Sequence, residues 1–323
     1  MLKNKTKVEI LSISIISLII IGMFSTTVYG VTYQVALKKG TEQFNVEYYN
    51  DSAWKSTVNS SSTPNEWFVG DADVTDAKSK KTVMGWNYIT WETYDVFVSV
   101  FLSTIFNGIL SSALFLLLES QGYNETTINA NYTSDYLLWY GLQAVWNFND
   151  EAFEEEPSYS EGILILQNPL KYKIMLEDYN NLAEDLNSNF AIQMAGYSFP
   201  NLTADEFLWQ LAFNGLALAK PFSDYALELV NELGCENVTV NTVNGLTSLR
   251  FEQTGETNYT VEFSYGLKGT LSSFTVKDID DNIIYQIIST NSDWIFYTIL
   301  IIGAVGISGL IGYTIFRRKK LKR

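Results

Sequence analysis

The sequence contains no histidine. Imidazole is the most frequent general base near neutral pH and the most frequent zinc ligand, so its absence excludes Ser-His-Asp and Cys-His catalytic arrangements. Gly-rich phosphate loops, CxxC and GxSxG motifs are missing as well. The enzyme most compatible with a chain that lacks histidine is one that uses a pair of carboxylates, such as a glycoside hydrolase.

Cysteine is nearly absent, because Cys235 is the only one in the chain. An intrachain disulfide is therefore impossible, and an exported domain would be held together by its core alone. The preceding Leu233 and Gly234 are typical of a helix end that packs on a core. We expect a buried free thiol at Cys235, with an intermolecular bridge as the alternative.

Basic residues are scarce between the two ends of the chain. Of the 21 Lys and Arg, three lie in the first seven residues and six in the last seven, which leaves 12 in the middle against 35 of the 36 Asp and Glu. A surface this acidic repels phosphate backbones, so nucleic acid is excluded as a partner of the middle region. The charge favours solubility in a salty medium or the binding of cations.

Both ends carry an apolar run. Residues 1–30 combine a basic start, apolar residues from Ile10 to Phe24 and small residues up to Gly30, which predicts a secretory signal peptide or an uncleaved anchor. Residues 294–316 form a stretch of 23 without a charge, which is long enough to cross a bilayer as a helix.

The basic tail 317–323 follows this predicted transmembrane helix and sets its orientation. By the positive-inside rule the tail is cytoplasmic, and the residues that would hold it there are Arg317, Arg318, Lys319 and Lys320. Small residues recur every four positions along the helix, at Ala304, Ser308 and Gly312. This face predicts self-association through close helix packing, in addition to contact with membrane lipid.

In its order of parts the chain resembles archaeal cell-surface proteins that carry an export signal, an acidic ectodomain rich in Asn, Thr and Tyr, and a C-terminal anchor followed by a basic tail, here RRKKLKR. The resemblance implies a single-pass protein of the cell membrane with residues 31–293 outside and residues 317–323 in the cytoplasm. It carries over no catalytic residue.

A third uncharged run, Val96 to Leu118, is predicted not to span the membrane. A crossing there would reverse the last helix and place its basic tail outside, against the positive-inside rule. Several Ser and Asn residues also interrupt the run. We expect a core element in which a strand passes into a helix, and a lipid-contacting surface is the alternative.

The remaining pattern predicts an α+β ectodomain with an antiparallel sheet. β-Branched and aromatic residues predict strands in both terminal thirds, at residues 31–37, 44–49, 82–98, 247–253, 259–265, 270–277 and 283–288. The last four strands would form a β-meander, since buried and polar residues alternate from Tyr259 to Tyr265.

Helices are predicted between the two groups of strands. Asn168 and Pro169 open one helix, with apolar residues at steps of three and four up to Leu186. Thr203 and Glu206 form a capping box for a second helix through Ala219, and a third ends at Gly234. The second and third would pack as a short hairpin.

Three kinds of site are suggested by motifs. N-x-Ser/Thr sequons make glycosylation candidates of Asn59, Asn124, Asn131, Asn201, Asn237 and Asn258. Acidic clusters could bind calcium: Asp71, Asp73 and Asp76; five acids between Asp150 and Glu156; and Asp278, Asp280 and Asp281. None of them matches the twelve-residue calcium loop, so no metal ligand is assigned.

Three functions are compatible with this sequence. The first is a non-enzymatic surface protein that binds a partner protein, a glycan or another copy of itself. The second is a lipid-binding ectodomain in which a curved sheet and the run from Val96 to Leu118 enclose an apolar cavity. The third is a carboxylate-dependent hydrolase, for which Glu92 is the acid with the most aromatic neighbours.

Overall fold

The computed structural model describes residues 32–102, 112–243 and 245–290. The predicted signal peptide, the transmembrane helix with its small-residue face and the basic tail lie outside the described residues. Within the described ranges, no helix is both long and apolar enough to cross a membrane.

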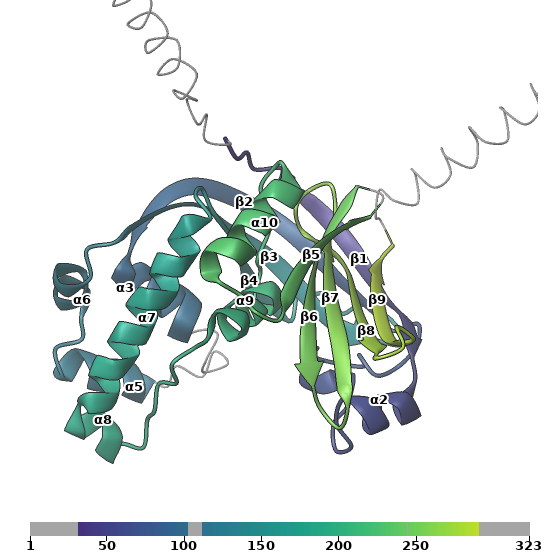
Figure 1. Cartoon of the computed structure of the whole chain (residues 1–323), viewed down its shortest axis with the longest axis horizontal. Coiled ribbons are helices and arrows are strands. Elements are labelled where there is room, and N and C mark those ends of the chain that lie inside the picture. Colours follow the sequence, from purple (N-terminus) through teal and green to yellow (C-terminus); the bar gives the residue numbers. More distant parts are fainter. Residues whose placement is uncertain (1–31, 103–111, 244, 291–323) are drawn as a thin grey trace, which may run out of the picture. The chain divides into compact units, whose positions relative to one another are not determined.

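A single nine-stranded sheet, antiparallel throughout, organises the fold (Figure 1). The strands lie in the order β4-β3-β2-β1-β9-β8-β7-β6-β5. Their bounds are β1 Gly40–Tyr49, β2 Lys78–Glu92, β3 Asp135–Asn149, β4 Tyr159–Leu166, β5 Val238–Val243, β6 Leu246–Thr254, β7 Asn258–Tyr265, β8 Leu271–Asp278 and β9 Ile283–Ser289.

The helices fall between the strands in sequence. Two short ones, α2 Asp51–Thr57 and the 3₁₀-helix η1 Pro64–Glu66, follow β1. The others are α3 Thr93–Val96, the π-helix η2 Phe97–Leu102, α5 Ser112–Ser120, α6 Glu125–Asn131, α7 Leu170–Ser188, α8 Phe190–Met194, α9 Ala204–Phe213 and α10 Phe222–Leu233. The α+β class is therefore as predicted.

The C-terminal meander is confirmed. Tyr259, Val261, Phe263 and Tyr265 of β7 are buried, and the residues between them are not, as a strand with one covered face requires. A tight turn joins β8 to β9, where the Asp278 carboxylate accepts the backbone N–H groups of two following residues. The last strand then pairs with β1, so the two strand groups of the sequence belong to one sheet.

The long strands β2 and β3 bury opposite faces in their two halves. Tyr136 near the start of β3 is fully buried and donates a hydrogen bond of 2.6 Å to Asp178 of α7. Gln143 is seven positions further along, hence on the other face, and is buried between β2 and β4. Figure 1 shows β2 passing from the meander to the group of α3, α6 and α7. These two strands connect a helical layer, formed by α3, η2 and α5 to α8, with the curled remainder of the sheet.

Several predicted boundaries are wrong. Residues 31–37 form no strand in the described part beyond a single bridge between Gln34 and Lys220. The strand predicted to reach residue 98 ends at Glu92, because a capping box there starts α3. The apolar run from residue 96 is helical in its described parts, not a strand that turns into a helix, although most of its described apolar side chains are in the core as expected.

The predicted helical hairpin is also wrong. α9 begins with the predicted capping box but ends at Phe213, and α10 ends at Gly234 as predicted. Between them, residues 214–220 are not helical: a turn at Asn214 and Gly215 is followed by β-bridges at Leu216 and Lys220, and the segment connects distant parts of the sheet. Leu164 of β4 donates to the carbonyl of Gly215, and Leu218 donates to Gly269 in the turn between β7 and β8. This crossing segment therefore joins β4 to the turn between β7 and β8 across the curled sheet.

Gly215 lets the crossing segment approach β4. Its φ is +93°, and a Cβ built on it would lie 1.8 Å from the Gly162 carbonyl oxygen. We expect Gly215→Ala to lower the free energy of unfolding by about 3 kcal/mol, from a left-handed backbone and two disturbed hydrogen bonds. Gly196→Ala is the matched control, since its φ is +80° but open space surrounds it. Urea titrations in which both variants lose the same free energy of unfolding would contradict the close approach of Gly215 to β4.

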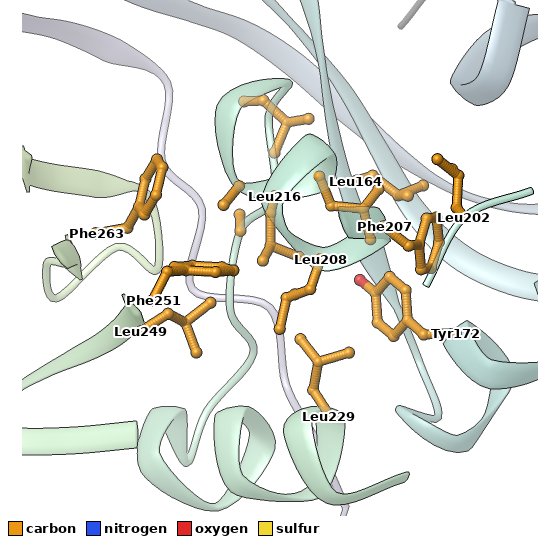
Figure 2. Close-up of a cluster of buried hydrophobic side chains, with 14 of the residues drawn as sticks. Leu164, Tyr172, Leu202, Phe207, Leu208, Leu216, Leu229, Leu249, Phe251 and Phe263 are labelled. Atoms are coloured by element: carbon orange, nitrogen blue, oxygen red, sulfur yellow. The ribbon is translucent and has the colours of Figure 1, made fainter. Parts of the chain in front are cut away.

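Aromatic side chains fill the concave face of the meander. Trp209 and Phe213 of α9 meet Phe263 of β7 at centroid distances of 5.8 and 4.9 Å. On its other side α9 reaches the helical layer, where Phe207 stacks on Phe101 at 5.6 Å. Figure 2 shows Phe207 and Leu208 of α9 between residues of β6 and β7 and those around Tyr172. Helix α9 therefore fills the interior of the curled sheet.

Candidate functional site

The interior of the curled sheet leaves little space. A cavity of about 40 Å³ lies under the end of α9, beside Phe44, Phe68 and Phe213. Pockets for small-molecule ligands measure roughly 300–1,000 Å³, so this one has room for ordered water and not for an acyl chain. The apolar cavity required by the lipid-binding hypothesis is filled here by aromatic rings.

A row of polar side chains crosses four strands at the floor of this cavity. Glu42 pairs in register with Lys81, and Gln143 pairs with Glu161. Lys81 Nζ and Gln143 Nε2 both lie 2.9 Å from Glu161 Oε2. Lys268, which follows β7, forms an ion pair of 2.8 Å with Glu42. The row thus links β4 to the turn after β7, and its two Lys and two Glu balance.

The charge on Lys81 is maintained by its partner. Burial lowers the pKa of Lys81, but Glu161, together with Tyr159 and Glu42, outweighs this effect, and the net pKa lies above its usual value. A lysine held in this way remains an ammonium ion at neutral pH and does not serve as a base. The row is therefore best understood as a structural network.

The acids nominated from the sequence have structural partners. Glu92 is the N-cap of α3 and accepts a hydrogen bond from Asn129, so its carboxylate is occupied at a helix start. Asp71 accepts the backbone N–H of Asp150 and lines a polar surface pocket of about 190 Å³ beside Trp146. Among the described residues, no group of three or more acids or Cys is arranged to hold a metal ion.

The six candidate asparagines for glycosylation differ in how free their side chains are. Asn124 is half-buried, and its side chain caps α6. The amide nitrogens of Asn201 and Asn237 donate to Glu184 and Asp205. The remaining three sequon residues, all exposed, are Asn59, Asn131 and Asn258. Glycosylation attaches to the amide nitrogen, so these three are the more accessible candidates.

Cys235 is half-buried after the end of α10. Burial, together with the nearby Asp205 carboxylate, raises the pKa of the thiol to about 12. Because the thiolate is the reactive form, we expect native protein to react with a disulfide reagent at pH 8 at least about 100-fold more slowly than urea-unfolded protein. Absorbance of the released thiol measures both rates, and a comparable native rate would contradict this environment.

Three strongly exposed apolar residues lie on the helical layer, Leu116 on α5 and Phe190 and Met194 on α8, and we call them the apolar tip. Phe190 and Met194 are 74% and 72% exposed, and they lie one turn apart on the same face of α8. Leu116 of α5 is 63% exposed. Tyr123, just after α5, donates to the Asp185 carbonyl at the end of α7, which ties the chain after α5 to α7. Sequence patterns did not point to Phe190 and Met194, whereas Leu116 lies in the apolar run for which a lipid-contacting surface was the alternative.

Two asparagines hold α8 firmly in place. Asn187 of α7 donates to the Phe199 carbonyl at 2.6 Å and accepts its N–H at 2.9 Å. Asn180, two turns earlier, makes the same pair of bonds with Leu202 at 2.9 and 2.8 Å. These bonds anchor the chain that returns from α8 along α7. The exposed side chains of α8 are thus presented on a braced turn and not on a loose loop.

Phe190 and Met194 are two of the three large apolar residues in the described part of the chain that are more than 70% exposed. The third, Ile279 at 73%, lies in the turn between β8 and β9. On β3, Leu137 and Leu142 are exposed five positions apart, which puts them on opposite faces of the strand. The apolar tip is therefore the strongest candidate for a binding surface among the described residues.

Comparison of the chain with protein-family models, with curated proteins and with solved structures gave no match. We therefore infer its function from its own residues.

Proposed function

We propose that this chain is a non-enzymatic, membrane-anchored cell-surface protein that binds a partner protein through the apolar tip of its helical layer. The observation that carries this proposal is the exposure of Phe190 and Met194, about three quarters each, on a helical turn next to the partly buried hydrogen bonds between Asn187 and Phe199. Large apolar side chains that are grouped and rigidly held in water are typical of protein interaction sites.

The membrane anchor is proposed from the sequence. Residues 1–30 would direct export, residues 294–316 would cross the bilayer, and the basic tail would stay in the cytoplasm. The apolar tip would then be outside the cell, on the same side as the accessible sequons.

The alternative functions have less support in the described residues. A lipid carrier needs a cavity that the aromatic side chains occupy here, with about 40 Å³ left. A hydrolase needs two carboxylates free to act across a cleft, whereas Glu92 caps a helix and Glu161 is paired with Lys81.

Cysteine labelling in intact cells tests the orientation. With Cys235 replaced by Ser, one variant carries Phe190→Cys and the other Lys320→Cys in the full chain. We expect a membrane-impermeant maleimide to label position 190 without lysis and position 320 only after lysis. The reverse pattern would overturn the proposed topology, and with it the surface location.

Site-directed photocrosslinking in intact cells tests the binding surface. A photoreactive phenylalanine replaces Phe190 in one full-length variant and Ile279, equally exposed but isolated, in the control. We expect a discrete adduct of higher mass from position 190 that is absent from position 279 and weakened by Met194→Ser in the same chain. Identical adduct patterns at both positions would contradict a binding surface at the tip.

A further inference from the structure

The apolar tip lies in a region without basic residues. The stretches 93–134 and 174–213, which supply most of the helical layer and α9, contain three and six acids respectively and no Lys, Arg or His, a formal charge of −9. The first base before Phe190 is Lys173, 17 residues earlier near the start of α7. At 1.5 Å per residue this is about 25 Å away along the helix.

Among the described residues, none of these carboxylates is in an ion pair. The five ion pairs found there all lie elsewhere, on the sheet with its turns and on α2. Two acids of α7 are instead bonded to neutral groups: Asp178 accepts from Tyr136, and Asp185 accepts from Tyr132 at 2.6 Å. Neutral donors orient a carboxylate but leave its charge in place, so the negative potential around the tip is not compensated.

This charge selects among the possible occupants of the tip. An anionic bilayer surface and a second copy of this chain, whose net charge is −15, would both be repelled. A basic protein segment would be attracted, and apolar side chains on that segment would cover Phe190 and Met194. Glu119 lies one turn from Leu116, and Glu184 lies in the last two turns of α7, so carboxylates lie within reach of the partner's Lys and Arg.

We propose that the tip recognises a basic amphipathic segment of a partner protein, whose apolar side chains pack on Phe190, Met194 and Leu116 while its Lys and Arg face the uncompensated carboxylates of the helical layer. This inference rests on the proposed function and adds the chemistry of the partner. Apolar contacts supply the affinity of such an interface, and the charges supply its selectivity and its salt dependence.

The probe is a helical peptide of about 18 residues, built from Leu and Lys with one photoreactive leucine, and its counterpart has Glu in place of every Lys. Full-length protein is reconstituted in zwitterionic nanodiscs, irradiated over a range of peptide concentrations, and the adducts are located by mass spectrometry. Covalent attachment to the chain separates binding by the protein from binding of the peptide to lipid. We expect saturable adducts in α5 and α8 with the Lys peptide and at least about tenfold weaker labelling with the Glu peptide.

Two pairs of variants separate the apolar and charged contributions. The double variant with Phe190→Ser and Met194→Ser leaves the charge unchanged. It should raise the peptide concentration at half-saturation at least about tenfold, whereas Ile279→Ser should not. The triple variant E119Q/E177Q/E184Q should raise this concentration about tenfold at about 50 mM salt and much less at about 500 mM. Its control, E47Q/E236Q/E252Q, removes the same number of exposed charges elsewhere and should change half-saturation less than about threefold.

Each other outcome overturns the inference. Adducts spread over the whole acidic surface and unchanged in the double Ser variant would reduce the binding to general charge attraction. Equal labelling by both peptides, or labelling by neither, would contradict the inference that the partner is basic. The photocrosslinks from position 190 in cells would still stand in these cases, so the proposed function can survive the failure of this inference.

Discussion

Phe274→Ala is expected to lower the free energy of unfolding by about 3–5 kcal/mol, the largest loss among the changes considered for this protein. Phe274 of β8 is fully buried, and its ring lies 4.9 Å from Phe68, 5.0 Å from Phe263 and 5.6 Å from Phe213. Removing the ring leaves a cavity between a strand, a loop and the end of α9, and these elements cannot all move inward to fill it.

Phe190→Ala is the matched control, since the same ring is removed from an exposed position. Its free energy of unfolding should stay within about 0.5 kcal/mol of the wild type. Urea denaturation of the full-length protein, followed by tryptophan fluorescence, measures both variants. If the two variants differed by less than about 1 kcal/mol in free energy of unfolding, the aromatic side chains around Phe274 would not be tightly packed.

Lys81→Met is expected to cost about 2–3 kcal/mol, somewhat less than the loss of one partner from a fully buried pair. The side chains of Lys81 and Glu161 are 25% and 11% exposed, so removing the ammonium leaves the Glu161 carboxylate unbalanced in a poorly solvated place. The control is Lys55→Met, whose partner Asp51 is exposed, and it should change stability by less than about 0.5 kcal/mol. The double variant K81M/E161Q should be more stable than K81M alone.

The same ion pair predicts a pH dependence. The pKa of Lys81 in the folded protein lies above its unfolded value of about 10.4. The stabilisation that comes from this shift is therefore fully present below about pH 10 and is lost as the pH rises through the folded pKa. The difference in stability between wild type and K81M should be constant from about pH 7 to 9 and should shrink above about pH 10. A difference that grew over that upper range would contradict the assigned partners.

The elements predicted well from sequence are those with local causes. The meander from β6 to β9 has alternating residues and turn-forming residues, so its pattern is complete within each strand. α7 has its apolar residues at helical spacing, and α9 starts at a capping box that four consecutive residues specify.

The elements that were missed have nonlocal causes. β3 exchanges its buried face between Tyr136 and Gln143, which cancels the alternation by which a strand is recognised. The crossing segment after α9 was predicted as helix, because its apolar residues say nothing about the strand edge that they pair with. In α8, Phe190, Ile192 and Met194 are all apolar, yet only Ile192 is buried. A run of apolar residues this short does not indicate which of them face the solvent.

The sequence by itself determined the class of fold, the acidity of the central region, the exclusion of imidazole and disulfide chemistry, and the expectation of an exported, anchored chain. These follow from composition and from periodicities of a few residues. Only the tertiary structure decided that aromatic rings fill the curled sheet, that Lys81 and Glu161 are partners across β3, and that Phe190 and Met194 remain uncovered. Burial and pairing depend on which distant segments meet, and a residue's type states how much it favours burial without stating whether the fold provides a neighbour to cover it.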